Sequence, residues 1–304
     1  MASAFDGRLA VSERVVADFA QRLREASSGR LTLRVAGPDV VPVAEQFDTV
    51  AKGLYDFLFT TQAHHAGVTS LALGIYATRP DPAGWRENGL FDAVDKDYER
   101  HKLKLVAAVF GENAETGAFQ IVLRRPIGPT GDLTGLKIRG NRNYQPLIEA
   151  LGGIVVLMRD DDIRGALEGG IIDGAAWPIG GALDWRWHEV ARHMARPAFG
   201  HRVYILAASL DRFRRLPAAD RTLITEIGKR LEVTGMAAME EQVQADLAQL
   251  KALGMQETAF DGPKFANALA RYYDGLWATA ASNAFSAESA RALRETAQKA
   301  GLAN

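Results

Sequence analysis

The sequence has no cysteine, and it has no apolar run long enough to cross a membrane. Without thiols, the 304-residue chain forms no disulfide bond and performs no thiolate chemistry. The absence of cysteine suits an oxidising compartment, although cytosolic proteins also lack cysteine in some cases. A membrane-spanning helix needs about 20 predominantly apolar residues, so we expect none in this sequence.

Excess charge of either sign is also missing. The chain carries 36 Lys and Arg against 37 Asp and Glu, a formal net charge of −1, and its basic residues do not cluster. A nucleic-acid partner is therefore not expected, because phosphate backbones are bound by gathered Lys and Arg. The start, MASAFDGRLAVSERV, lacks the basic and apolar regions of a secretory signal, which leaves a cytoplasmic chain and a chain without its signal as alternatives.

What is present is an alternation of helical and strand patterns. We expect strands at residues 31–35, 54–61, 103–110, 117–125, 136–138, 154–158, 171–176, 201–213 and 255–260. We expect helices at 12–28, 42–52, 85–101, about 143–151, about 161–168 and about 217–252, and two more near the C-terminus. This alternation predicts an α/β protein in which helices pack on a sheet.

The common catalytic signatures are missing. The sequence contains neither a Gly-x-Ser-x-Gly elbow nor a phosphate loop ending in Gly-Lys-Ser/Thr. The motif HEVARH places His188 and His193 five positions apart, so on a helix they would point about 140° away from each other. A zinc site there is not expected, and the adjacent His64 and His65 are interpreted as loop residues.

Three predicted strands end in side chains suited to binding. One runs into Thr60, Thr61 and Gln62, a second ends on Arg139, and a third runs into Trp177. Ligands of open α/β sheets lie beyond the carboxyl ends of strands, so these tips are expected to line one cleft. Taken alone, Arg139 could be a solvated charge and Trp177 a core residue.

The same segments resemble a known family. DLTGLKIR (132–139), LIEALGGIVVLM (147–158), ALEGGIIDGAAW (166–177) and LPAADRTLITEIGKRLE (216–232) are similar to the substrate-binding proteins of tripartite ATP-independent periplasmic (TRAP) transporters, the DctP type. SSGRLTLRV and VAEQFDTVAKGLYDFLFTT agree in the N-terminal part, so the resemblance covers about residues 10 to 280.

The resemblance implies that Arg139 anchors the carboxylate of an organic acid, since a guanidinium can match a carboxylate through two parallel hydrogen bonds. The following turn, with Asn141, Arg142 and Asn143, would lie near the same oxygens. Two positions depart from family patterns, because Phe119 stands where many sialic-acid-type members have a second arginine and Trp177 stands where many members have asparagine. Both changes add aromatic surface, which favours a monocarboxylate with an apolar, aromatic or 2-oxo/2-hydroxy body over a sugar acid.

A third departure concerns the first strand that the family places before helix one. Residues 1–11 form a short and poor strand pattern, so some contacts of the first lobe are expected to be missing. Glu45, Gln46, Glu112 and Asn113 are the remaining candidates for first-lobe contacts, although for each the interpretation as a solvated helix or loop residue is favoured.

We therefore predict a two-lobed periplasmic-binding-protein type II clamshell with strands crossing between the lobes. Lobe I takes residues 1–121 and 206–255, lobe II takes 122–205, and the helices of 256–304 pack across both. The predicted protein is periplasmic and not an enzyme, and it passes its acid to the TRAP membrane permease. No cofactor is predicted, and a bridging metal ion is left open. The alternatives are an α/β enzyme acting on a small acid and a ligand sensor partnered with a signalling receptor.

Overall fold

The computed structural model describes residues 1–111, 118–141, 144–282 and 287–304. The chain divides into two compact units, each built from separate stretches of sequence. Unit 1 takes residues 1–112, 202–240 and 277–303, and unit 2 takes 113–201, 241–276 and Asn304. Among the described residues, no helix combines the length and the apolar character that a membrane span requires.

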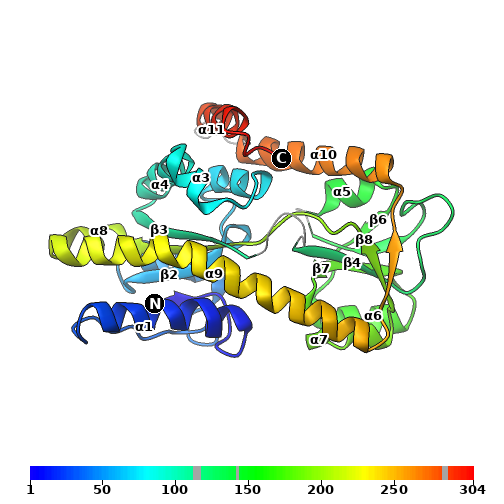
Figure 1. Ribbon diagram of the computed structural model, residues 1–304, viewed down its shortest axis with the longest axis horizontal. Coiled ribbons are helices and arrows are strands. Elements are labelled where there is room, and N and C mark those ends of the chain that lie inside the picture. Colours follow the sequence, from blue (N-terminus) through cyan, green and yellow to red (C-terminus); the bar gives the residue numbers. More distant parts are fainter. Residues whose placement is uncertain (112–117, 142–143, 283–286) are drawn as a thin grey trace. The chain divides into compact units, whose positions relative to one another are not determined.

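Unit 1 is organised around a four-stranded sheet in the order β1-β2-β9-β3. Its strands β2 and β3 are labelled in Figure 1. The strands are β1 (Ala2–Ser3), β2 (Phe57–Thr61), β3 (Leu103–Phe110) and β9 (Val203–Ser209). β1 is parallel to β2, whereas β9 is antiparallel to both of its neighbours. The long connections between the strands contain the helices of this unit.

The helical elements of unit 1 cover both faces of this sheet. They are η1 (Ser12–Val16), α1 (Ala17–Ala26), α2 (Val43–Ala51), η2 (Gln62–His64), η3 (Ser70–Ala77), α3 (Pro82–Glu87), α4 (Leu90–Arg100), α8 (Leu210–Arg215), the first part of α9 (Ala218–Ala252) and α11 (Ala287–Lys299). Phe19 of α1 and Leu231 of α9 share one core with Phe59 and Leu206 of the sheet. Alternate strand residues face this core because successive side chains of a strand point to opposite sides.

Unit 2 contains a six-stranded sheet in the order β10-β8-β4-β7-β5-β6. Its strands are β4 (Phe119–Leu123), β5 (Lys137–Arg139), β6 (Ile154–Val156), β7 (Gly174–Pro178), β8 (His193–Arg196) and β10 (Gln256–Ala259). β5 is parallel to both β6 and β7, and β4 is antiparallel to β7 and β8.

Short helices connect these strands. They are α5 (Gln145–Ala150), η4 (Asp160–Asp162), α6 (Ile163–Glu168), α7 (Gly180–Asp184) and η5 (Trp187–Glu189), and α10 (Gly262–Ala280) follows β10. The core of unit 2 joins Ile163 and Leu167 of α6 to Met194 of β8 and to Val243 and Leu250 of α9.

Some predicted elements differ from the structure, and one strand was missed. Residues 31–35 alternate like a strand but form none, and only Ala36 makes an isolated bridge, to Ala2. The helix expected over 85–101 is divided into α3 and α4, because Gly89 adopts a left-handed conformation with φ of 73°. Strand β8 was not predicted, although Met194 and Ala195 are buried within it.

The observed units differ from the predicted lobe boundaries. β4 was expected to end lobe I at residue 121, but it lies in unit 2 because it pairs with β7 and β8. The part of α9 from residue 241 was assigned to lobe I, yet its apolar side chains complete the core of unit 2. In the C-terminal segment, β10 and residues 262–276 belong to unit 2, and residues 277–303 belong to unit 1.

Candidate functional site

Three parallel strands of unit 2 bring polar and aromatic side chains to one edge of its sheet. β6, β5 and β7 are neighbours and run in the same direction, with Arg139 aligned to Val156 and to Ala175. Asp160 follows β6, Arg139 ends β5, and Trp177 lies near the end of β7. The carboxyl edge of a parallel sheet is the position at which α/β proteins bind ligands.

Arg139 is the central residue of this edge. Its side chain is only 6% exposed, and its Nη2 donates to Asp160 Oδ1 at 2.6 Å. Nη2 also lies 3.5 Å from the carbonyl oxygen of Met158, a long contact. The buried Nε and Nη1 atoms have no hydrogen-bond partner in the described part of the chain. Burial lowers the pKa of this guanidinium, and the nearby Asp160 opposes that effect.

Trp177 covers the face of the same guanidinium. The Arg139 Cζ atom lies 4.4 Å from the centre of the Trp177 ring, a cation–π arrangement. Of the three strand tips expected to line one cleft, those with Arg139 and Trp177 lie together within unit 2. The tip with Thr60, Thr61 and Gln62 belongs to unit 1, so the shared cleft stays a prediction. Whether either side chain contacts a ligand stays a prediction.

Trp177 belongs to a cluster of three tryptophans. Its ring centre lies 5.3 Å from that of Trp185 and 6.2 Å from that of Trp187, and these two rings stack 5.4 Å apart. Trp187 is fully buried, whereas Trp185 is 36% exposed. Gly181 packs directly against the Trp177 ring, because a Cβ atom there would collide with Trp177 Cδ1. The cluster thus forms an aromatic surface beside Arg139.

Phe119 lies at the same edge of the sheet and is buried among other aromatic rings. It begins β4 and aligns with Pro178 at the end of β7. Its ring centre is 4.7 Å from that of Tyr144 and 5.6 Å from that of Phe199. Phe119 is 6% exposed, so in this structure most of its surface is used by this packing.

Asn141 has a local structural contact. Its Oδ1 accepts a hydrogen bond from the backbone N–H of Tyr144, where α5 begins, at 3.1 Å. The bond holds the chain just before α5, whose N-cap residue is Tyr144. A contact between Asn141 and a ligand stays a prediction, and Asn143 and Arg142 lie outside the described residues.

Gln62 is enclosed within unit 1. Its Nε2 donates to the carbonyl and hydroxyl oxygens of Thr69, and its Oε1 accepts from the Tyr98 hydroxyl at 2.9 Å. Tyr98 also bonds to His65 Nε2 at 2.7 Å. Gln62 is fully buried, so its amide holds this network together in the structure. A role in binding therefore stays a prediction for Gln62.

The other first-lobe candidates have varied surroundings. Glu112 and Asn113 lie outside the described residues. Glu45 is exposed on α2, and the buried Gln46 donates to the carbonyl oxygens of Ser3 and Val41, which ties α2 to the first strand. The predicted weak first strand is real but short, since β1 contains only Ala2 and Ser3.

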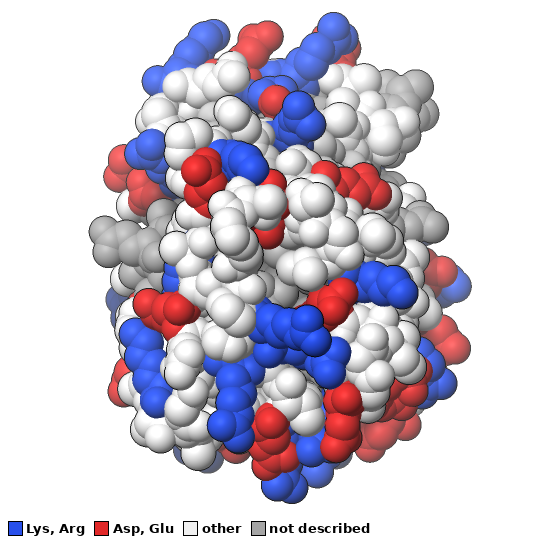
Figure 2. Space-filling view, turned by 90° about the vertical axis from the view of Figure 1, so that its right-hand side faces the viewer, with Lys and Arg blue, Asp and Glu red and all other residues white. Residues whose placement is uncertain are grey.

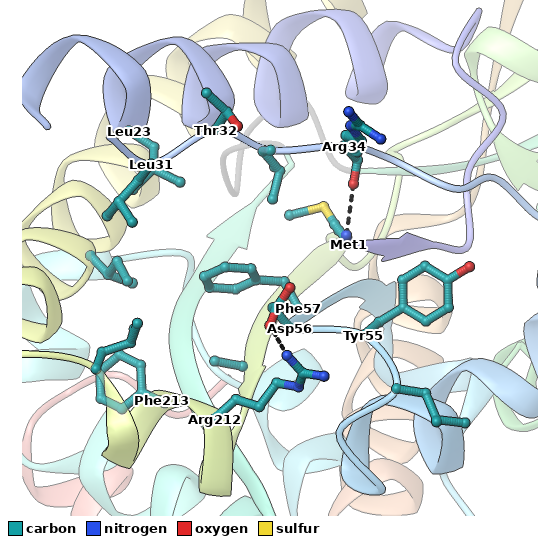
Figure 3. A pocket seen from close by; sticks show the side chains of 15 residues that line it. Met1, Leu23, Leu31, Thr32, Arg34, Tyr55, Asp56, Phe57, Arg212 and Phe213 are labelled. Atoms are coloured by element: carbon teal, nitrogen blue, oxygen red, sulfur yellow. Dashed lines mark hydrogen bonds and ion pairs between the residues drawn. The ribbon is translucent and has the colours of Figure 1, made fainter. Parts of the chain in front are cut away.

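Unit 1 also contains a cavity that the sequence did not predict. It has a volume of about 460 Å³ and lies between α1, α8 and the strands (Figure 3). Its walls combine apolar residues such as Leu23 and Phe213 with an ion pair of 3.2 Å between Asp56 and Arg212. The Met1 amino group there donates to the Arg34 carbonyl at 2.7 Å. The predicted binding residues do not line this cavity.

The described residues contain no group of three or more His, Asp or Glu placed to hold a metal ion.

On the face shown in Figure 2, basic and acidic side chains are interspersed, in line with the near-balanced composition.

Asp160 and Trp185 were not predicted as site residues. The signal for Asp160 was visible in the sequence, because the run Asp160–Asp162 directly follows the strand pattern of residues 154–158. The polar ends of other strands are predicted to bind a ligand, whereas this acidic run is interpreted as the start of the helix expected at about 161–168. Trp185 follows α7 and had no pattern that set it apart from a core tryptophan.

Comparison with known proteins identifies the class of the protein. The profile of the bacterial extracellular solute-binding protein family 7, DctP, matches residues 7–280, and the chain belongs to this family. The predicted resemblance is thereby confirmed: this is a solute-binding protein of the TRAP type, and such proteins bind a transporter's substrate and are not enzymes.

Individual relatives are distant in sequence. A solute-binding protein of Albidiferax ferrireducens is 21% identical over 241 residues, which cover 75% of this chain and 69% of the relative. A ligand-free, open TRAP periplasmic solute-binding protein from Rhodobacter sphaeroides is 16% identical with a TM-score of 0.85, and 98% of each chain is covered. One from Rhodoferax ferrireducens with bound malonate is 18% identical with a TM-score of 0.77, covering 98% of this chain and 96% of that one.

These structures confirm the predicted two-lobed α/β fold class. Other similar TRAP proteins hold D-glucuronate, β-D-galacturonate or orotic acid. Ligands therefore differ widely among proteins of this fold.

Proposed function

We propose that this protein captures a small organic acid, a monocarboxylate, through the guanidinium of Arg139. The observation that carries the proposal is the burial of that side chain together with its incomplete hydrogen bonding. Arg139 is a buried cation in which Nε and Nη1 lack partners within the described residues. A buried donor without a partner costs about 1–3 kcal/mol, and a carboxylate is the group that best satisfies a guanidinium.

The surroundings of Arg139 support a ligand with an apolar or aromatic body. Trp177 covers the guanidinium face, so a carboxylate would approach along the edge of the group. Trp185 is the most exposed of the three tryptophans, and it offers an apolar surface close to Trp177. The ligands named for the similar structures are chemically diverse, but all are carboxylic acids.

Binding would act through closure of the two lobes. A ligand favours a closed form only to the extent that it binds that form better than the open one. The loaded protein would then deliver its acid to the TRAP membrane permease in the periplasm. Membership of the family supports this partner and this location.

The test combines a thermal-shift screen with titration calorimetry. About a hundred small acids, with amides and neutral sugars as controls, are screened against the purified protein, because a ligand that binds only the folded form raises the Tm. For each hit, Arg139→Ala is expected to weaken binding at least about tenfold, since truncating one partner of a buried charge pair costs roughly 2–5 kcal/mol.

The matched control is Arg159→Ala. Arg159 is also an arginine that pairs with an aspartate, Asp161, at 3.0 Å, but its side chain is 80% exposed. We expect this variant to bind like the original protein. An unchanged dissociation constant in Arg139→Ala, with both variants folded, would remove the anchor from Arg139.

Delivery is tested separately. Uptake of a labelled hit by vesicles that contain the permease encoded with this protein should require the added protein and should fall with Arg139→Ala. Binding without any stimulation of uptake would favour a signalling receptor as the partner.

A further inference from the structure

Asp160 changes the charge of the site that Arg139 forms. Its carboxylate binds Nη2 of Arg139 at 2.6 Å, so the buried cation already has one anionic neighbour supplied by the protein. The two side chains together carry no net charge. An acid bound at Arg139 would therefore add an uncompensated negative charge to this pair.

The geometry of a guanidinium places the two carboxylates close together. The group can hold a carboxylate bidentately through Nε and Nη2 or through Nη1 and Nη2, so both modes include Nη2. Nη2 is the atom that donates to Asp160. A ligand carboxylate that uses the unpartnered Nε or Nη1 in a bidentate pair thus lies beside the Asp160 carboxylate, and like charges at this separation repel.

Asp160 is itself suited to receive a ligand group. Its side chain is 50% exposed, and only its Oδ1 accepts a hydrogen bond from the described residues, which leaves Oδ2 open. It belongs to the short turn η4, directly after β6. The neighbouring Asp161 is already paired with Arg159 at 3.0 Å, so it does not offer an equivalent free carboxylate.

We infer that the ligand is an acid that also carries an ammonium group, as a zwitterionic amino acid does, with its carboxylate on Arg139 and its ammonium on Asp160. This arrangement pairs both charges of the ligand with both charges of the site and removes the repulsion between the two carboxylates. The inference rests on the proposed role of Arg139 and makes Asp160 the residue that determines specificity.

The body of such a ligand would face the tryptophans. Trp177 already stacks on Arg139, and Trp185 lies next to it with part of its ring exposed. A zwitterion with an apolar side chain would place that side chain against this aromatic surface. The site therefore defines the carboxylate and the ammonium of the ligand. The side chain of the ligand is identified by comparing amino acids with side chains of different size.

The experiment compares ligands that differ only in the amino group. Calorimetry is run with three pairs: alanine and propanoate, leucine and 4-methylpentanoate, and phenylalanine and 3-phenylpropanoate. In the original protein, the amino acid of at least one pair should bind about tenfold or more tightly than its deaminated partner. The 2-hydroxy analogue of each pair tests whether a neutral hydrogen-bond donor is enough.

Two variants then test the assignment to Asp160. Asp160→Asn keeps the shape of the side chain but removes its charge. It should therefore weaken binding of the amino acid and strengthen binding of the deaminated acid, which reduces or reverses the preference for the amino acid. Asp161→Asn lies in the same turn and should leave the preference unchanged. Asp160 is 50% exposed and Asp161 is 68% exposed, and the amide oxygen introduced by Asp160→Asn can still accept a hydrogen bond from Arg139, so melting curves should show that both variants fold.

The outcomes separate this inference from the proposed function. If deaminated or hydroxy acids bind more tightly than amino acids and still require Arg139, the inference is overturned and the anchor stands. A preference for amino acids that survives in Asp160→Asn also overturns it. If no amino acid binds while another acid from the screen binds through Arg139, the inference is overturned and the proposed function stands.

Discussion

The network around His65 predicts how the stability of unit 1 changes with pH. His65 is 6% exposed and bonds to the Tyr98 hydroxyl, and burial, with repulsion from His64 and His101, lowers its pKa from 6.5 to about 3. In the folded protein it is therefore neutral near pH 5, whereas in the unfolded chain it binds a proton below about pH 6.5. Because the unfolded state binds more protons, the free energy of unfolding falls as pH falls from 6.5 toward 3.

The size of the effect follows from the two pKa values. Each pH unit between them contributes up to 1.36 kcal/mol, so His65 should remove about 2 kcal/mol of stability between pH 7 and pH 5. Burial also lowers the pKa of His64, which acts in the same direction. The variant His65→Gln keeps a hydrogen-bonding side chain but does not titrate, so it should lose about 2 kcal/mol less than the original protein over this range.

The assay is urea unfolding at pH 7, 6 and 5 at constant ionic strength, with hydrogen exchange of β2 and α4 as a readout local to unit 1. The two proteins are compared by the slope of the free energy of unfolding against pH, because the substitution also changes that free energy at every pH. All other titrating groups are shared by the two proteins and cancel in the difference. Parallel stability curves for the original protein and His65→Gln would refute the reasoning.

Two further substitutions test contacts within each unit. Gly181→Ala would push the Trp177 ring from its position, so we expect a shift in tryptophan fluorescence and weaker ligand binding; Gly165→Ala, where no atom lies near the added methyl group, should change neither. Glu232→Ala removes the buried carboxylate that accepts from Arg86 Nε at 2.6 Å and Nη2 at 2.9 Å and from the Ala108 N–H at 2.9 Å. Chemical unfolding should show a loss of about 3 kcal/mol, because Arg86, which is only 21% exposed, and the buried Ala108 N–H both lose this acceptor. A loss under about 1 kcal/mol would show that solvent reaches the freed guanidinium.

Much of the fold was predictable because its signals are local. The apolar spacing over residues 217–252 matches α9, and the strand patterns at 103–110 and 54–61 match β3 and β2. The strand pattern at 31–35 failed because alternation alone does not supply a partner strand, and Val35 is 48% exposed. β8 was missed because a strand of only four residues with two charged or polar ends has little periodicity of its own.

The site was predictable only in part, for a physical reason. The rule that ligands gather at the carboxyl ends of parallel strands placed Arg139 and Trp177 correctly next to each other. The same rule does not distinguish a side chain that faces a ligand from one that is already hydrogen-bonded within its own unit. Gln62 is of the second kind, because it bonds to Thr69 and Tyr98. The role of Asp160 was missed because it depends on a hydrogen bond from Arg139, which lies 21 positions earlier in the chain.

The way in which α9 serves two cores has a consequence for the order of synthesis. The core of unit 1 needs Leu231 of α9 as well as the strands that end at Phe110, and the core of unit 2 needs Leu250. At roughly 5–20 residues per second, the ribosome takes about 6–24 s to go from Phe110 to Leu231. During that interval the early strands have no completed core, so the core of unit 1 can be completed only after α9 has been made.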